Sequence, residues 1–183
     1  MTNRYDLIKI QEKLQKKLTP DRYQHTLGVM YTCAALAMCH GCNLERAMVA
    51  GLLHDCAKCI PNDKKISICE KNNIAITEAE RKNPSLLHAK AGVFLAKSKY
   101  DIEDEDILDA IRYHTTGNVD MTLLQKITYL ADYIEPWRNK ATNLPAIREA
   151  AFQDLDKALY MVCLLYTSPS PRDISGSRMP SSA

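Results

Sequence analysis

Apolar residues recur every three or four positions along most of this chain, which is the spacing of one face of an α-helix. The first such set consists of Leu7, Ile10, Leu14 and Leu18. No segment sustains the two-residue alternation of apolar and polar positions that indicates a half-buried strand. The pattern therefore predicts an all-α fold.

Start and stop signals divide this pattern into helices. Thr19 and Pro20 combine a capping side chain with proline at the first helical position, and Gly41 is typical of a helix end. Asn43 caps a third helix, which we expect to stop before Pro61. Further helices are expected at residues 62–73, from the capping box at 77–80, from 84, and at 103–114, 122–136 and 145–165.

Length and composition favour one globular domain. A chain of 183 residues can bury a core without disulfides or structural metal, and we assign this domain to residues 1–165. From Thr167 the chain becomes rich in Ser and Pro, and such a segment cannot bury enough apolar surface to order itself. Because it also resembles translated adapter read-through, we expect residues 166–183 to be a disordered, non-native tail that truncates the last helix.

Charge and hydropathy exclude several classes of protein. The net charge of +2 provides neither a basic stripe for nucleic acid nor a basic patch for an anionic membrane. No apolar run approaches the ~20 residues that span a bilayer, and the N-terminus carries no apolar signal segment. We therefore expect a cytoplasmic protein.

The seven cysteines are expected to be reduced thiols in that compartment. Two CxxC pairs, Cys39–Cys42 and Cys56–Cys59, raise the alternative of a cysteine-bound zinc ion. The helix expected between them, from Leu44 to Leu53, is a rod of about 15 Å that would hold the pairs apart. Small side chains that fill the core are the better interpretation of these cysteines.

Six side chains with metal-binding chemistry lie on or beside the predicted helices. His54 and Asp55 stand side by side in an apolar helical segment, and a buried imidazole beside a buried carboxylate needs a strong partner, most commonly a metal ion. His40 is left out, because the helix dipole explains a histidine at a helix C-terminus. Drawn into one core, the six could hold two ions, with Asp55 as the bridge. These candidate ligands are His25, His54, Asp55, His88, His114 and Asp132.

This ligand set predicts an anionic substrate. Two divalent cations carry four positive charges and two aspartates return two negative ones, so charge remains for a bridging hydroxide and for phosphate oxygens. Two ions ~3.5–4 Å apart would activate the shared water for in-line attack and stabilise the charge that develops on a phosphoryl group.

The order His25, His54-Asp55, Asp132 resembles the H…HD…D signature of the HD-domain metal-dependent phosphohydrolases. Four local motifs are more specific: RYQHTLGV at 22–29, LHDCAK at 53–58, AIRYHTTG at 110–117 and KITYLADYIEP at 126–136. Over residues 22–165 the chain is similar to the YqeK family of bacterial symmetrical bis(5′-nucleosyl)-tetraphosphatases.

This resemblance implies an HD-domain helical bundle with a di-iron centre in its core, which cleaves a dinucleoside polyphosphate, diadenosine tetraphosphate, into two ADP. Mixed imidazole and carboxylate ligation also suits manganese, cobalt or zinc, and a homodimer is compatible with this reading. By matching position, the first ion would be held by His25, His54, Asp55 and Asp132, and the second by Asp55, His88 and His114.

Substrate contacts are expected from cationic and polar side chains near the ligands. Lys58 lies four residues after His54, on the same face of the expected helix. We expect it to be catalytic together with Asp55, as a phosphate contact or leaving-group stabiliser; the alternative is a solvated lysine. Arg22 precedes His25 by about one turn and could also reach the phosphates. Further candidates, with helix stop and surface charge as alternative roles, are Thr115, Thr116, Gly117 and Arg138.

The sequence leaves two other functions open. One is a different HD phosphohydrolase that acts on nucleoside monophosphates, deoxynucleoside triphosphates or cyclic nucleotides, and product analysis would discriminate it. The other is a non-catalytic nucleotide-binding or helical interaction module. A missing ligand would favour that module, and all six candidate ligands are present.

Overall fold

The computed structural model describes residues 4–167, in which every regular element is a helix. The all-α prediction is therefore confirmed. The last helix ends at Thr167, and the rest of the predicted tail, residues 168–183, lies outside the described residues. None of the described helices is both long and apolar enough to cross a membrane. In chain order they are α1 (Leu7–Gln15), α2 (Pro20–His40), α3 (Leu44–Leu53), α4 (Asn62–Lys71), α5 (Glu78–Lys82), the short 3₁₀ helix η1 (Pro84–Leu87), α6 (His88–Tyr100), α7 (Glu105–Tyr113), α8 (Leu123–Ile134), α9 (Leu144–Gln153) and α10 (Leu155–Thr167).

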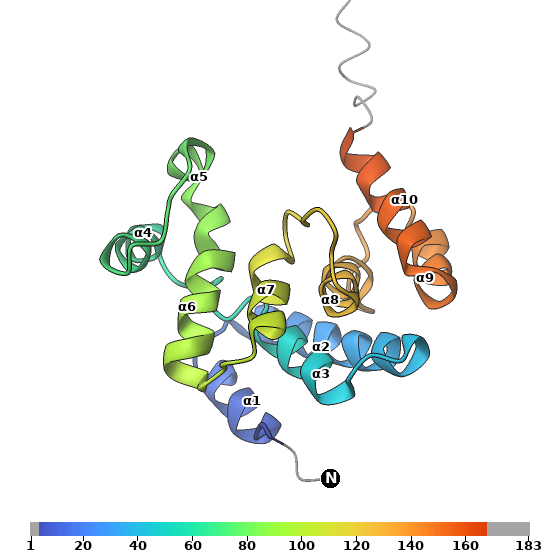
Figure 1. Ribbon diagram of the computed structural model, residues 1–183, viewed down its shortest axis with the longest axis horizontal. Coiled ribbons are helices and arrows are strands. Elements are labelled where there is room, and N and C mark those ends of the chain that lie inside the picture. Colours follow the sequence, from blue (N-terminus) through green and yellow to red (C-terminus); the bar gives the residue numbers. More distant parts are fainter. Residues whose placement is uncertain (1–3, 168–183) are drawn as a thin grey trace, which may run out of the picture.

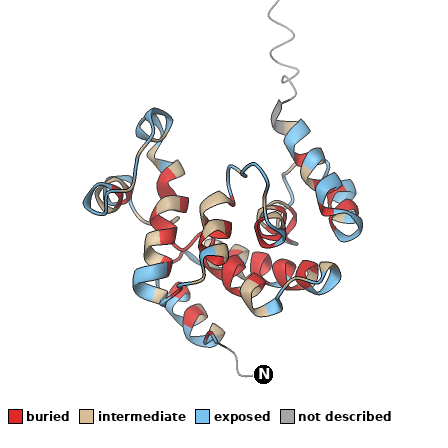
Figure 2. Cartoon of the chain, in the orientation of Figure 1, coloured by how far each residue is buried: buried red, intermediate tan, exposed pale blue. Residues whose placement is uncertain are grey.

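The core lies between α2, α3, α7 and α8, which pack against one another at the centre of the molecule (Figure 1). Buried residues line the facing sides of these helices (Figure 2). The helices α4 to α6 lie on one side of this centre, and α9 and α10 lie on the other (Figure 1). A Cβ atom on Gly51 would lie 2.9 Å from Cα of Met30. The close approach of α3 to α2 therefore depends on glycine at this position.

The predicted helix starts and stops are largely confirmed. The side chain of Thr19 caps α2 by accepting a hydrogen bond from the amide of Arg22, and Gly41 ends α2 with φ of 73°. Asn43 caps α3 in the same way. Thr77 and Thr122 each form a complete capping box, at the starts of α5 and α8. These local interactions fix where four of the helices begin and where α2 ends.

The prediction that His54 and Asp55 lie within the third helix is wrong. The helix ends at Leu53, and residues 54–59 form turns. Nδ1 of His54 donates a hydrogen bond to the carbonyl of Gly51 at 2.7 Å. In a continuing α-helix the carbonyl of Gly51 would accept a hydrogen bond from the amide of Asp55. The imidazole of His54 takes the place of that amide, and the helix ends. Lys58 consequently does not share a helix face with His54.

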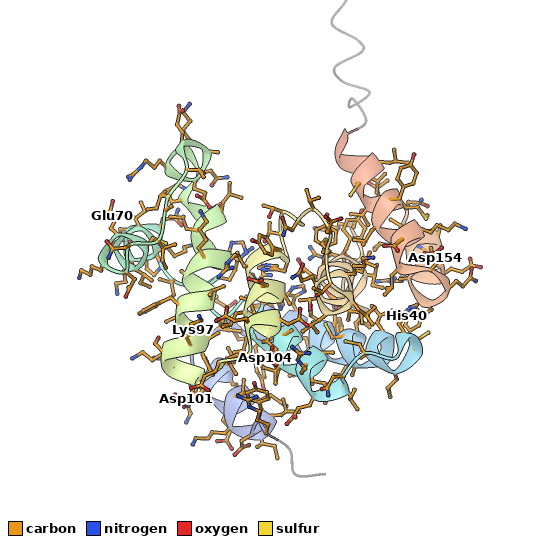
Figure 3. The ribbon with its side chains drawn as sticks, in the orientation of Figure 1. His40, Glu70, Lys97, Asp101, Asp104 and Asp154 are labelled. Carbon is orange, nitrogen blue, oxygen red and sulfur yellow. The ribbon has the colours of Figure 1, made fainter. Side chains whose placement is uncertain are left out.

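The prediction of one helix over 145–165 is also wrong, because Asp154 separates α9 from α10 (Figure 3). Its backbone is extended, with φ of −153° and ψ of 106°. Its carboxylate accepts hydrogen bonds from the amides of Asp156 and Lys157 at 2.9 and 3.0 Å. This is N-cap geometry, so Asp154 both ends one helix and starts the next. His40, near by at the end of α2, donates through Nε2 to the carbonyl of Ala151 at 2.7 Å (Figure 3).

Candidate metal centre

Five helices bring the six predicted ligands together at the centre of the bundle. His25 projects from α2 and Asp132 from α8, whereas His54, His88 and His114 lie at helix ends. Their ligand atoms form three overlapping groups, within each of which all atoms lie within 4.8 Å of one another. These groups are His25, His54 and Asp55; His54, His114 and Asp132; and Asp55, His88 and His114.

Asp55 occupies the middle of this cluster, and its two carboxylate oxygens face different histidines. Oδ1 lies 3.2 Å from Nε2 of His88 and 3.5 Å from Nε2 of His114. Oδ2 lies 3.6 Å from Nε2 of His54 and accepts a 2.9 Å hydrogen bond from Arg22. One oxygen is therefore directed to each half of the cluster, as a bridging carboxylate requires.

Asp132 serves the half of the cluster that contains His25. Its Oδ1 lies 3.1 Å from Nε2 of His25 and 4.0 Å from Nε2 of His54. The same oxygen accepts a 2.7 Å hydrogen bond from Arg138. A divalent transition metal sits about 2.1 Å from imidazole nitrogen or carboxylate oxygen, so one ion can contact two atoms that are up to about 4.2 Å apart. The spacing of these donors fits that limit.

The outer nitrogens of the histidines fix how their rings face the cluster. Nδ1 of His88 donates to the carbonyl of Ser85 at 2.7 Å, and Nδ1 of His114 donates to the carbonyl of Ile111 at 2.8 Å. Nδ1 of His54 likewise donates to the carbonyl of the residue three positions earlier, Gly51. A carbonyl can only accept, so Nδ1 carries the proton in all three rings. In its neutral form each ring presents the lone pair of Nε2 to the cluster, which is the form that binds metal.

Burial keeps the imidazoles of His54 and His88 neutral, whereas at His114 the effect of burial is outweighed by the hydrogen bond and charge of Asp55, which raise the pKa. Burial lowers the pKa of His54 to about 4 against the attraction of Asp55 and Asp132, and it lowers the pKa of His88 to about 4 in the same way. The Nε2 lone pair of His54 therefore faces oxygens of Asp55 and Asp132 without a proton between them, which is unfavourable unless a cation lies there. Among residues 4–167, buried atoms that make no hydrogen bond include Nε2 of His25, Nε2 of His54 and Oδ1 of Asp55.

The predicted substrate residues fall into two groups. Arg22, Lys58, Thr115 and Arg138 line a cavity of about 280 Å³ together with Asp55, His114 and Asp132. Although Lys58 lies in a turn, its Nζ is 3.1 Å from Nε2 of His88 and 3.6 Å from Oδ1 of Asp55.

Thr116 and Gly117 do not line this cavity. Thr116 is exposed and donates to the carbonyl of Gly117, whose φ of 66° belongs to a tight turn after α7. Of the two, Gly117 therefore fits its alternative interpretation as a helix stop.

The sequence interpretation missed Glu135, which is buried at the C-terminal end of α8 with 2% of its surface exposed. Its Oε1 lies 3.1 Å from Nδ1 of His25, the ring nitrogen that faces away from the cluster. It also missed Tyr129 and Tyr133, which line the cavity. A signal was available for Glu135, because it follows Asp132 by three residues and immediately precedes Pro136, which ends the predicted helix.

Comparison with known proteins connects this geometry with one family. A model of the HD domain matches residues 22–137. The symmetrical bis(5′-nucleosyl)-tetraphosphatase of Bacillus subtilis is 42% identical over 147 residues, which cover 80% of this chain and 77% of that protein. The protein of the same name from Halalkalibacterium halodurans is 42% identical over 143 residues, which cover 78% and 75%.

A solved structure extends the similarity to the whole fold. It is a crystal structure from Clostridium acetobutylicum described as a predicted HD superfamily hydrolase involved in NAD metabolism. It superposes with a TM-score of 0.84 at 41% identity and covers 96% of this chain and 92% of that one.

Proposed function

The chain belongs to the HD domain family and, within it, to the symmetrical bis(5′-nucleosyl)-tetraphosphatases, and we propose that it hydrolyses diadenosine tetraphosphate into two molecules of ADP. The observation that carries this proposal is the position of Asp55, whose two oxygens face His54 on one side and His88 and His114 on the other. A single carboxylate between two sets of imidazoles is suited to a pair of metal ions.

The residues of the cluster fit such a pair. His25, His54, Asp55 and Asp132 would hold one ion, and Asp55, His88 and His114 would hold the other, with iron as the proposed metal. Two divalent ions supply Lewis-acid stabilisation of the charge that develops on a phosphoryl group, and they make water acidic enough to attack at neutral pH. The buried imidazole of His54, whose Nδ1 donates to a carbonyl and whose Nε2 makes no hydrogen bond, supports this assignment.

The cationic side chains around the cavity would neutralise the tetraphosphate. Arg22 lies 2.9 Å from Asp55, and Arg138 lies 2.7 Å from Asp132. About a third of each arginine side chain is exposed. They can therefore contact phosphate oxygens while they orient the carboxylates. Lys58 lies on the opposite side of Asp55, where it would stabilise the charge on the departing ADP.

The experiment that tests this function compares wild type with Asp55→Asn after anaerobic purification. We expect wild type to contain two transition metal ions per chain and to release ADP alone from diadenosine tetraphosphate. Asp55→Asn should lose metal and at least about 10³-fold in kcat, since several kcal/mol of transition-state stabilisation depend on the ions. Asp109→Asn, which changes an aspartate of α7 that is paired with Arg112, is the matched control and should retain both. Release of AMP and ATP by wild type would overturn the proposal.

A further inference from the structure

A second cavity lies beside the metal centre, next to the one that contains Asp55. It has a volume of about 320 Å³, and its lining includes His25, Glu135 and Trp137. Arg22 and Arg138 line both cavities. The two arginines therefore stand at the boundary between two spaces that adjoin the same cluster of ligands.

Trp137 is the single tryptophan of the chain, and 66% of its surface is exposed. Its backbone is tied to the end of α8, because its amide donates to Oε2 of Glu135 at 2.7 Å. Its ring Cδ1 lies 3.5 Å from the position of a Cβ atom on Gly28, so one edge of the indole lies against α2. A large aromatic ring held in place with most of its surface open is a stacking platform.

The proposed reaction requires room for two nucleosides. Symmetrical cleavage places the attacked bond at the middle of the substrate, so one adenosine extends to each side of the metal centre. Small-molecule pockets usually measure about 300–1,000 Å³. The two cavities, at about 280 and 320 Å³, are close to the lower limit of that range, and each suits one half of the substrate.

We propose that the indole of Trp137 stacks on the adenine of one half of the substrate in the second cavity. The other half occupies the first cavity, beside Tyr129 and Tyr133, and the tetraphosphate passes between Arg22 and Arg138. This assignment rests on the proposed function, because only a substrate with a nucleoside at each end requires both cavities.

Trp137 also provides the means to test this assignment, because all tryptophan fluorescence of the chain comes from one position. The ligand is an analogue of diadenosine tetraphosphate with a methylene group in place of the central bridging oxygen, added to the metal-loaded enzyme. We expect saturable quenching by this analogue and none by inorganic tripolyphosphate, which has phosphates but no base. Equal quenching by both would overturn the assignment, since it would report phosphate binding alone.

Kinetics provide the second readout. Stacking on one base is expected to be worth about 10-fold or more in binding, so Trp137→Ala should raise KM for diadenosine tetraphosphate at least about 10-fold and change kcat less than threefold. Trp137→Phe should restore most of the loss. Tyr160→Ala, which removes a similarly exposed aromatic ring on α10, is the control and should have no effect.

The two proposals fail in different ways. Normal turnover by Trp137→Ala with an unchanged KM would overturn the stacking assignment and leave the function in place. Saturable quenching by the analogue without hydrolysis of diadenosine tetraphosphate would support the stacking assignment and overturn the function.

Discussion

A Cβ atom on Gly28 would lie 2.5 Å from Oε2 of Glu135, so glycine at this position allows the buried carboxylate at the end of α8 to lie directly against α2. This contact places Oε1 of Glu135 3.1 Å from Nδ1 of His25. The other three histidines of the cluster use a backbone carbonyl of their own helix or turn for the same purpose. The orientation of His25 thus depends on the packing of α8 against α2.

Gly28→Ala is therefore predicted to weaken metal binding. The added methyl group would push the Glu135 carboxylate away from His25, and loss of such an outer partner typically costs about 10- to 100-fold in metal affinity. Titration of the metal-free protein with Mn²⁺ measures the effect, and Glu135→Gln, which keeps the shape and one acceptor oxygen, should cause a smaller loss. Wild-type affinity in Gly28→Ala would contradict this role of Glu135.

The extent to which the sequence predicts this structure follows from these residues. Helix starts are encoded within a few residues, so the sequence predicts the caps at Thr19, Asn43 and Thr77. The sequence does not predict the end of α3, because it depends on the hydrogen bond from the side chain of His54 to the carbonyl of Gly51. The spacing of apolar residues carries no information about such a bond. The role of Glu135 depends on where α8 meets α2, which is a tertiary contact between residues more than a hundred positions apart.

Lys58→Ala is expected to lower kcat by about 10²- to 10³-fold while the metal content stays unchanged. This is the typical loss when one stabilising donor to a developing negative charge is removed, and Lys58 is within 3.6 Å of Asp55 without being a metal ligand. Steady-state kinetics and elemental analysis separate the two effects. Lys64→Ala, an exposed lysine on α4, is the matched control, and loss of metal in Lys58→Ala would show that the lysine acts structurally.

Thiol reactivity should divide the cysteines by burial. Burial raises the pKa of Cys56 to about 12, so at pH 8 only about one molecule in ten thousand carries the reactive thiolate there. Cys39, Cys59 and Cys163 are exposed and should react quickly with an alkylating reagent. Peptide mapping by mass spectrometry identifies the modified positions. Rapid labelling of Cys56 in the folded protein would contradict its burial beside the metal centre.

Asp154→Ala is predicted to destabilise the protein by about 1 kcal/mol, the usual cost of losing an N-cap. The carboxylate accepts from two amides at the start of α10, and alanine leaves both without that acceptor. Urea denaturation followed by circular dichroism gives the free energy of unfolding. Glu149→Ala, an exposed position on α9, should change it by much less, and an equal effect of both substitutions would contradict the capping role.

The most direct test of symmetrical cleavage is hydrolysis of diadenosine tetraphosphate by the metal-loaded enzyme in water enriched in ¹⁸O. The products are separated, and their masses are determined by mass spectrometry. Attack of water on one of the two inner phosphorus atoms places one ¹⁸O in one of the two ADP molecules. ADP should therefore be the sole nucleotide product, half of it labelled, and a chelator that strips the metal should abolish its formation. Label in AMP, with ATP as the second product, would contradict a site that positions its metals at the centre of a symmetrical substrate.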